Sequence, residues 1–89
     1  MDIHSKKLVV ITGGSKGIGA AIARKMTGLG LEVLLIARSK EQLELVKEYL
    51  EAEGGKVYAL QADLLKEKDI VRIARFIEKY AGQALLSWI

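Results

Sequence analysis

Apolar residues fall into two patterns along this chain. Residues 8–11 and 33–37 are short, continuous apolar runs, which is typical of parallel strands covered on both faces. The segments between them carry apolar residues at helical spacing. The patterns predict the order β-α-β-α-β-α-β, with strands at about 8–12, 33–37, 56–62 and 84–89. Helices are expected from about residues 15–17 to Gly30, from a Ser39 cap to Gly54, and over 66–80.

The helical spacing also predicts which side chains are buried. In the first helix the predicted buried face consists of Ile18, Ala21, Ile22, Met26 and Leu29. In the third helix it consists of Ile70, Ile73, Ala74, Ile77 and Tyr80. Ser39 with Gln42 three residues later is a capping-box pattern that starts the second helix.

This alternation predicts an α/β fold. Right-handed crossovers place about four parallel strands in the order 3-2-1-4, with three helices and a ligand crevice at the carboxyl ends of the strands. The 89 residues suit a single Rossmann-like, doubly wound half-domain over 1–89, truncated after strand four, and so short a chain builds a marginal core.

Composition narrows the class of protein. There is no cysteine, hence no disulfide framework, and we expect a cytoplasmic protein. The apolar run near the amino terminus is too short for a membrane span or a signal segment. The net charge of +3 comes from basic residues interspersed with acidic ones, which does not favour nucleic acid. A solvated surface together with a small anionic ligand explains the net charge more simply.

The glycine-rich segment Thr12-Gly13-Gly14-Ser15-Lys16-Gly17-Ile18-Gly19 follows the first strand and opens the first helix. In that context backbone N–H groups and the helix dipole stabilise a phosphate. The strict G-x-G-x-x-G pattern is not met, because Ile22 stands where the third glycine would fall. A plain turn between strand and helix is the alternative.

This segment resembles the signature of the short-chain dehydrogenase/reductase family. The resemblance runs from about residue 6 to about residue 80, roughly the first third of a typical member, and includes 37–39 and 62–64. It implies an NAD(P)-dependent oxidoreductase on a doubly wound sheet. Gly13, Gly17 and Gly19 would then shape the turn, and Ile18 would lend its amide to the pyrophosphate while its side chain packs.

The end of the second strand bears on which cofactor is bound. An acid there would bind a free ribose 2′-hydroxyl, but the chain has Arg38 and Ser39 instead. A guanidinium suits a 2′-phosphate, so NADP(H) is favoured over NAD. In the resembling family, Ser15 and Lys16 stand where NADP-preferring members often carry a hydroxyl and a basic residue. The alternatives are a solvated arginine for Arg38 and a helix cap for Ser39.

Asp63 and Leu64 follow the third strand. By the resemblance, the Asp63 carboxylate accepts a hydrogen bond from the adenine amino group, and the Leu64 amide binds a ring nitrogen. The alternative for Asp63 is an N-cap of the third helix, and the two roles are compatible.

The catalytic Tyr-x-x-x-Lys of the family is absent from this sequence, because Tyr49, Tyr58 and Tyr80 are followed four residues later by other residues. We therefore interpret the tyrosines as packing residues and the chain as an NADP(H)-binding fragment that is inactive alone. Its parent would transfer a hydride to a carbonyl. The alternative is a non-enzymatic, self-associating scaffold that binds no nucleotide.

The predicted fourth strand would form an edge of the sheet that bears Leu85, Leu86 and Trp88. Unpaired backbone groups and apolar side chains at such an edge favour association. We expect a homodimer that covers this edge.

Overall fold

A computed structural model describes residues 6–13, 17–81 and 84–88. The elements follow the predicted alternation of strands and helices: β1 (Lys6–Thr12), α1 (Gly17–Gly28), β2 (Glu32–Ala37), α2 (Lys40–Ala52), β3 (Val57–Gln61), α3 (Glu67–Ala81) and β4 (Ala84–Trp88). Their bounds differ from the predicted ones by one or two residues at most ends. The α/β class is confirmed.

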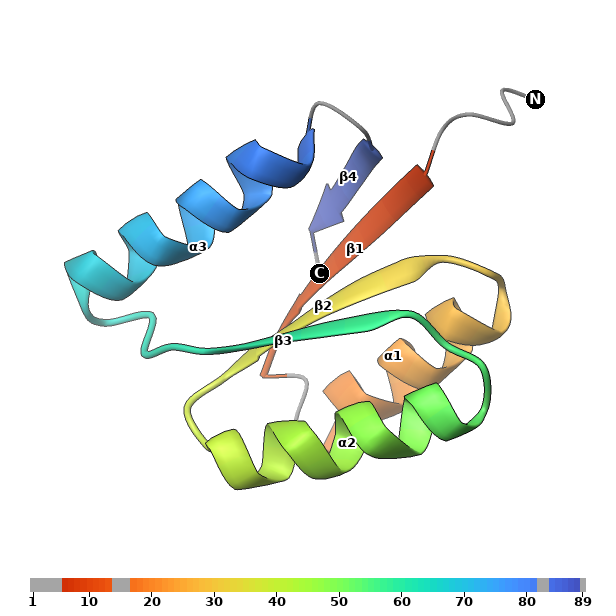
Figure 1. Cartoon of the computed structure of the whole chain (residues 1–89). Helices are drawn as coiled ribbons and strands as arrows, with labels where there is room; N and C mark the ends of the chain where they lie inside the picture. Colours follow the sequence, from red (N-terminus) through yellow and green to blue (C-terminus); the bar gives the residue numbers. More distant parts are fainter. Residues whose placement is uncertain (1–5, 14–16, 82–83, 89) are drawn as a thin grey trace.

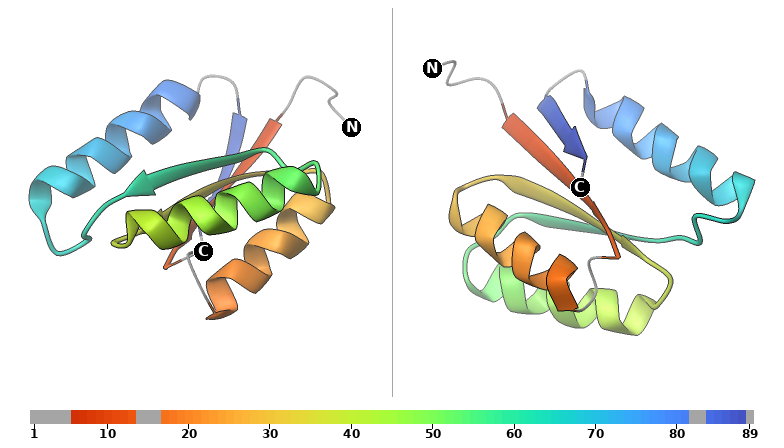
Figure 2. Two further views of the ribbon diagram at one scale, coloured as in Figure 1. Left: turned by 60° about the horizontal axis from the view of Figure 1, so that its bottom comes forward. Right: turned by 180° about the vertical axis from the view of Figure 1, so that it is seen from behind.

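The strands form one parallel sheet in the order β3-β2-β1-β4, which is the order that right-handed crossovers predict. Val9 of β1 pairs with Val33 of β2, and Leu34 of β2 pairs with Tyr58 of β3. The central position of β2 explains its continuous apolar sequence. Helices α1 and α2 cover one face of the sheet and α3 covers the other (Figures 1 and 2).

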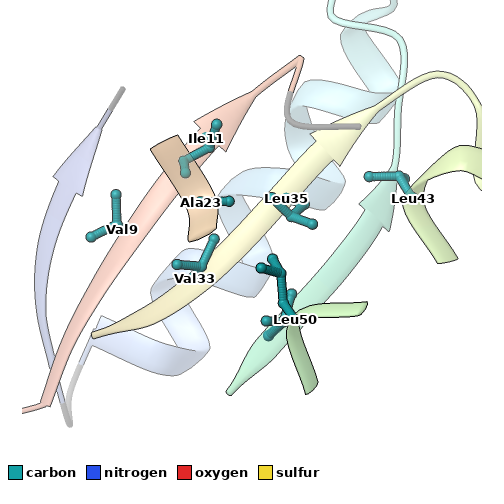
Figure 3. Packing of buried hydrophobic residues seen from close by; sticks show 8 residues of the cluster. Val9, Ile11, Ala23, Val33, Leu35, Leu43 and Leu50 are labelled. Carbon is teal, nitrogen blue, oxygen red and sulfur yellow. The ribbon is translucent and has the colours of Figure 1, made fainter. Parts of the chain in front are cut away.

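Alternate residues of β1 and β2 therefore belong to two separate cores. The core beneath α1 and α2 (Figure 3) consists of Val9, Ile11, Ala23, Val33, Leu35, Leu43, Leu50 and Val57. The core beneath α3 consists of Leu8, Val10, Leu34, Ile36, Ala62 and Ile73. The two-sided burial expected for the second strand is confirmed. The end of this buried strand forms part of the site described below.

The predicted buried faces of α1 and α3 are partly wrong. Ala23 is the fully buried residue of α1, whereas Ile18, Ala21 and Leu29 are exposed. On α3, Ile73 is buried and Phe76, Ile77 and Tyr80 pack against the core, whereas Ile70 and Ala74 are exposed. Each helix contacts one face of the sheet and buries a narrower stripe than its apolar pattern suggests.

A polar and aromatic cluster lies where the start of β2 meets the end of α3. The buried carboxylate of Glu32 accepts hydrogen bonds from the hydroxyls of Tyr58, at 3.3 Å, and Tyr80. Tyr58 packs edge-on against Phe76 and Tyr80. The packing role predicted for Tyr58 and Tyr80 is confirmed, but Tyr49 is 52% exposed on α2.

Among the described residues, no helix combines the length and the apolar character needed to cross a membrane.

Candidate functional site

The carboxyl ends of β1, β2 and β3 meet at one edge of the parallel sheet. The loops that follow them enclose an open cleft of about 480 Å³. Its walls come from the end of β2, from all three loops and from the start of α2: Gly13, Ile36, Ala37, Arg38, Ser39, Gln42, Ala62, Asp63, Leu64 and Leu65. Five of the predicted site residues are therefore brought together, namely Gly13, Arg38, Ser39, Asp63 and Leu64.

The chain leaves β1 through a turn that requires glycine. Gly13 has a φ of +69°, in the left-handed region, and its N–H donates to the Ile36 carbonyl at 2.7 Å. Gly17, with a φ of +61°, begins α1. The backbone of this turn is thus tied to the end of β2, beside the cleft.

The other residues of the predicted phosphate turn fall into two groups. Ser15 and Lys16 lie outside the described residues. Gly17, Ile18 and Gly19 form the first turn of α1 and do not line the cleft. The side chain of Ile18 is 80% exposed, so the prediction that it packs is wrong.

Ser39 and Arg38 connect β2 to α2. The Ser39 hydroxyl accepts a hydrogen bond from the Gln42 N–H at 3.3 Å, which confirms the predicted cap. The Arg38 carbonyl accepts one from the Gln61 side-chain amide at 3.0 Å. The backbone of Arg38 is therefore anchored to the end of β3, while its side chain is exposed at the junction of the cleft and an adjoining groove.

Asp63 shapes the loop between β3 and α3. Its Oδ1 accepts from the Leu65 N–H and its carbonyl accepts from the Lys66 N–H, both at 2.9 Å. Because α3 begins only at Glu67, Asp63 closes a turn before the helix. The N-cap interpretation of Asp63 is wrong, and the carboxylate stays beside the cleft together with Leu64.

Three polar residues of this region were not predicted from the sequence: Gln61, Asp69 and Arg72. Asp69 Oδ2 accepts the Asp63 N–H at 2.8 Å, and Arg72 donates to Asp69 Oδ1 at 3.0 Å and to the Gln61 carbonyl at 3.1 Å. The N–H of Asp63 and then the Arg72 guanidinium lower the pKa of the Asp69 carboxyl. The sequence signal that could have identified Asp69 is an acidic residue in the first turn of a helix.

The residues that line the cleft are of kinds that suit a nucleotide. Ile36, Ala37 and Ala62 give it an apolar lining that suits a flat ring, and Asp63 supplies an acceptor. The exposed Arg38 guanidinium at its border suits a phosphate. Within the described residues, no group of three or more acidic or histidine side chains is arranged to hold a metal ion.

Known proteins are similar to this chain in sequence and in fold. The family model described as short chain dehydrogenase matches residues 7–85. Farnesol dehydrogenase of Aedes aegypti is 37% identical over 92% of this chain and 34% of its own length.

Two solved structures show the same likeness. A metagenomic short-chain oxidoreductase in complex with NADP superposes with a TM-score of 0.82, at 38% identity, over 92% of this chain and 38% of that chain. A short-chain dehydrogenase from Sphingobium yanoikuyae in complex with NADPH has a TM-score of 0.75, also at 38% identity, over 80% of this chain and 28% of that chain. The present chain spans about a third of the length of such relatives.

Proposed function

We propose that the cleft of this chain binds NADP(H), since the chain belongs to the short-chain dehydrogenase family. The observation that carries the proposal is Arg38, whose backbone is fixed by Gln61 and whose exposed side chain borders the cleft. The two solved relatives are complexes with NADP and NADPH, which supports the same choice of cofactor.

The parts of the cleft suit the parts of the cofactor. In this proposal, Arg38 and Ser39 bind the 2′-phosphate, the apolar lining takes the adenine ring, and Asp63 and Leu64 bind its polar edge. The pyrophosphate lies against the turn that begins at Gly13 and the positive end of the α1 dipole. The other residues of that turn in the sequence are also proposed contacts of the pyrophosphate or the 2′-phosphate: Ser15, Lys16, Gly17, Ile18 and Gly19.

The chemistry of the whole protein is also a proposal. NADPH, when bound, would supply a hydride to a carbonyl substrate. The residues described here bind and orient the nucleotide, and the sequence holds no Tyr-x-x-x-Lys to donate a proton. We therefore propose that the 89-residue chain binds the cofactor without turning over a substrate.

Calorimetric titration with NADPH and NADH at moderate ionic strength tests this function, because salt then screens the nonspecific attraction of phosphate. Wild-type protein should bind NADPH more tightly. Arg38→Asp should weaken NADPH binding by about 10- to 100-fold, the effect of losing charge-assisted hydrogen bonds, and NADH binding much less. Arg75→Asp on α3 makes the same change in net charge outside the cleft and should leave the preference intact.

Two results would contradict the proposal. Equal losses for NADPH and NADH in Arg38→Asp would overturn the cofactor assignment. Binding of neither nucleotide by the wild-type chain would overturn cofactor binding itself and favour a non-enzymatic, self-associating scaffold.

A further inference from the structure

We infer that Asp69 and Arg72 of α3 are positioning residues that set the recognition of adenine by holding the Asp63–Leu64 segment in place. This inference rests on the proposed NADP(H) function. It assigns a role to two residues that do not line the cleft.

The contacts of the pair hold the first residue of the segment and the end of the strand that precedes it. Asp69 Oδ2 accepts the Asp63 N–H at 2.8 Å, and Arg72 donates to the Gln61 carbonyl at 3.1 Å. The ion pair between Asp69 Oδ1 and Arg72 Nη1, at 3.0 Å, joins the two contacts. The last residue of β3, Gln61, and the second residue of the loop, Asp63, are thus held by the same helix.

Asp69 is suited to this task by its environment. Its side chain is 13% exposed, whereas that of Arg72 is 51% exposed. The Asp63 N–H and Arg72 lower the pKa of the Asp69 carboxyl, so it is ionised at neutral pH. A hydrogen bond to an ionised acceptor is shorter and stronger than one between neutral groups.

The backbone position of Asp63 matters because its carboxylate has little freedom. Oδ1 is committed to the Leu65 N–H at 2.9 Å, which leaves Oδ2 for an adenine amino group. A hydrogen bond holds only over a range of roughly 2.7–3.2 Å, so a loop shift of about 1 Å would remove it. The Leu64 amide, on the same segment, would move with it.

The test compares two nucleotides that differ at the polar edge of the purine ring. NADPH carries the adenine amino group and an unprotonated ring N1, whereas reduced nicotinamide hypoxanthine dinucleotide phosphate carries a carbonyl and an N1–H in their place. Wild-type protein should prefer NADPH by about tenfold or more, because hypoxanthine cannot donate an amino hydrogen to Asp63 and its N1–H cannot accept from the Leu64 amide. In Asp69→Ala this ratio should fall to about one, because the acceptor is no longer held at hydrogen-bonding distance.

Three variants separate positioning from general damage. Asp69→Asn keeps an oxygen that accepts the Asp63 N–H and should restore most of the preference. Glu67→Ala removes another acid from the first turn of α3 and should keep the wild-type ratio. Arg72→Ala should lower the ratio as Asp69→Ala does, and it provides the test if Asp69→Ala does not fold.

The outcomes distinguish the two proposals. A loss of stability alone weakens the binding of both nucleotides equally and leaves the ratio of their affinities at its wild-type value. A wild-type ratio in Asp69→Ala or Arg72→Ala therefore overturns the inference, while the proposal of NADP(H) binding stands. If wild-type protein binds neither nucleotide, the proposed function fails and the inference fails with it. Wild-type binding without an adenine preference overturns the inference alone.

Discussion

Removing one hydroxyl from the cluster at the end of α3 should destabilise the whole chain. Tyr80→Phe deletes the hydrogen bond to the buried Glu32 carboxylate and keeps the ring that packs against Tyr58. Hydrogen bonds to charged groups contribute about 1.5–3 kcal/mol, and because Tyr80 is only half-buried we take the lower end, about 1.5 kcal/mol. For a domain of this size that loss lowers Tm by roughly 6–12 °C.

Urea and thermal unfolding followed by circular dichroism measure this loss. Tyr49→Phe is the matched control, because the same atom is removed from a tyrosine that is 52% exposed on α2. Its free energy of unfolding should stay within about 0.5 kcal/mol of wild type. If Tyr80→Phe changes stability no more than Tyr49→Phe does, the Glu32 contact does not stabilise the fold and the reasoning is wrong.

The pH dependence gives a second readout of the same contact. Burial, and then the hydrogen bond to Glu32, raise the pKa of the Tyr80 phenol above its usual value. In the unfolded chain the phenol ionises near pH 10, while in the folded chain it keeps its proton. The contribution is therefore complete below about pH 10 and is lost as the pH rises above it, by up to about 1.4 kcal/mol per pH unit. Urea midpoints between about pH 9 and pH 11 should fall less steeply in Tyr80→Phe; parallel curves would refute the shift.

Two further predictions concern the glycine turn and the sheet edge. Gly13→Ala should lower the free energy of unfolding by about 1 kcal/mol in thermal unfolding, because a φ of +69° is unfavourable for alanine although the added Cβ would meet no atom. Gly28→Ala is the control and should not destabilise the chain, because Gly28 has no positive φ. We also propose that the chain forms a homodimer through β4, which lies at an edge of the sheet beside β1; sedimentation of a monomer at high protein concentration would contradict this.

The parts of the fold that depend on neighbouring residues were predictable. The apolar run of β2 indicated burial on both faces, and the structure divides it between two cores, with Val33 on one side and Leu34 on the other. The Ser39 cap depends on a residue three positions away, so the sequence pattern was sufficient. The meeting of the three loops followed from parallel strands in the predicted order.

Contacts between distant residues were not predictable in the same way. Glu32 is a charged residue, which a sequence pattern assigns to the surface, yet its partners Tyr58 and Tyr80 come from β3 and α3 and allow it to be buried. Ile18 and Ile70 belong to apolar patterns but are exposed, because tertiary packing decides which stripe of a helix faces the sheet. Asp69 is an acid in the first turn of α3, a position that by itself indicates only an interaction with the helix dipole, and its contact with the loop depends on the turn that Asp63 closes.

Helix α3 connects the stability of the chain to its cleft. Ile73 is its one fully buried residue in the described part of the chain, and Phe76, Ile77 and Tyr80 are half-buried against the same core. Polar contacts secure it at both ends: Tyr80 to Glu32 at the start of β2, and Asp69 and Arg72 to the loop after β3. The helix that these contacts secure also holds the loop of the proposed adenine site. On the proposed function, its placement is therefore a condition for nucleotide binding as well as for folding.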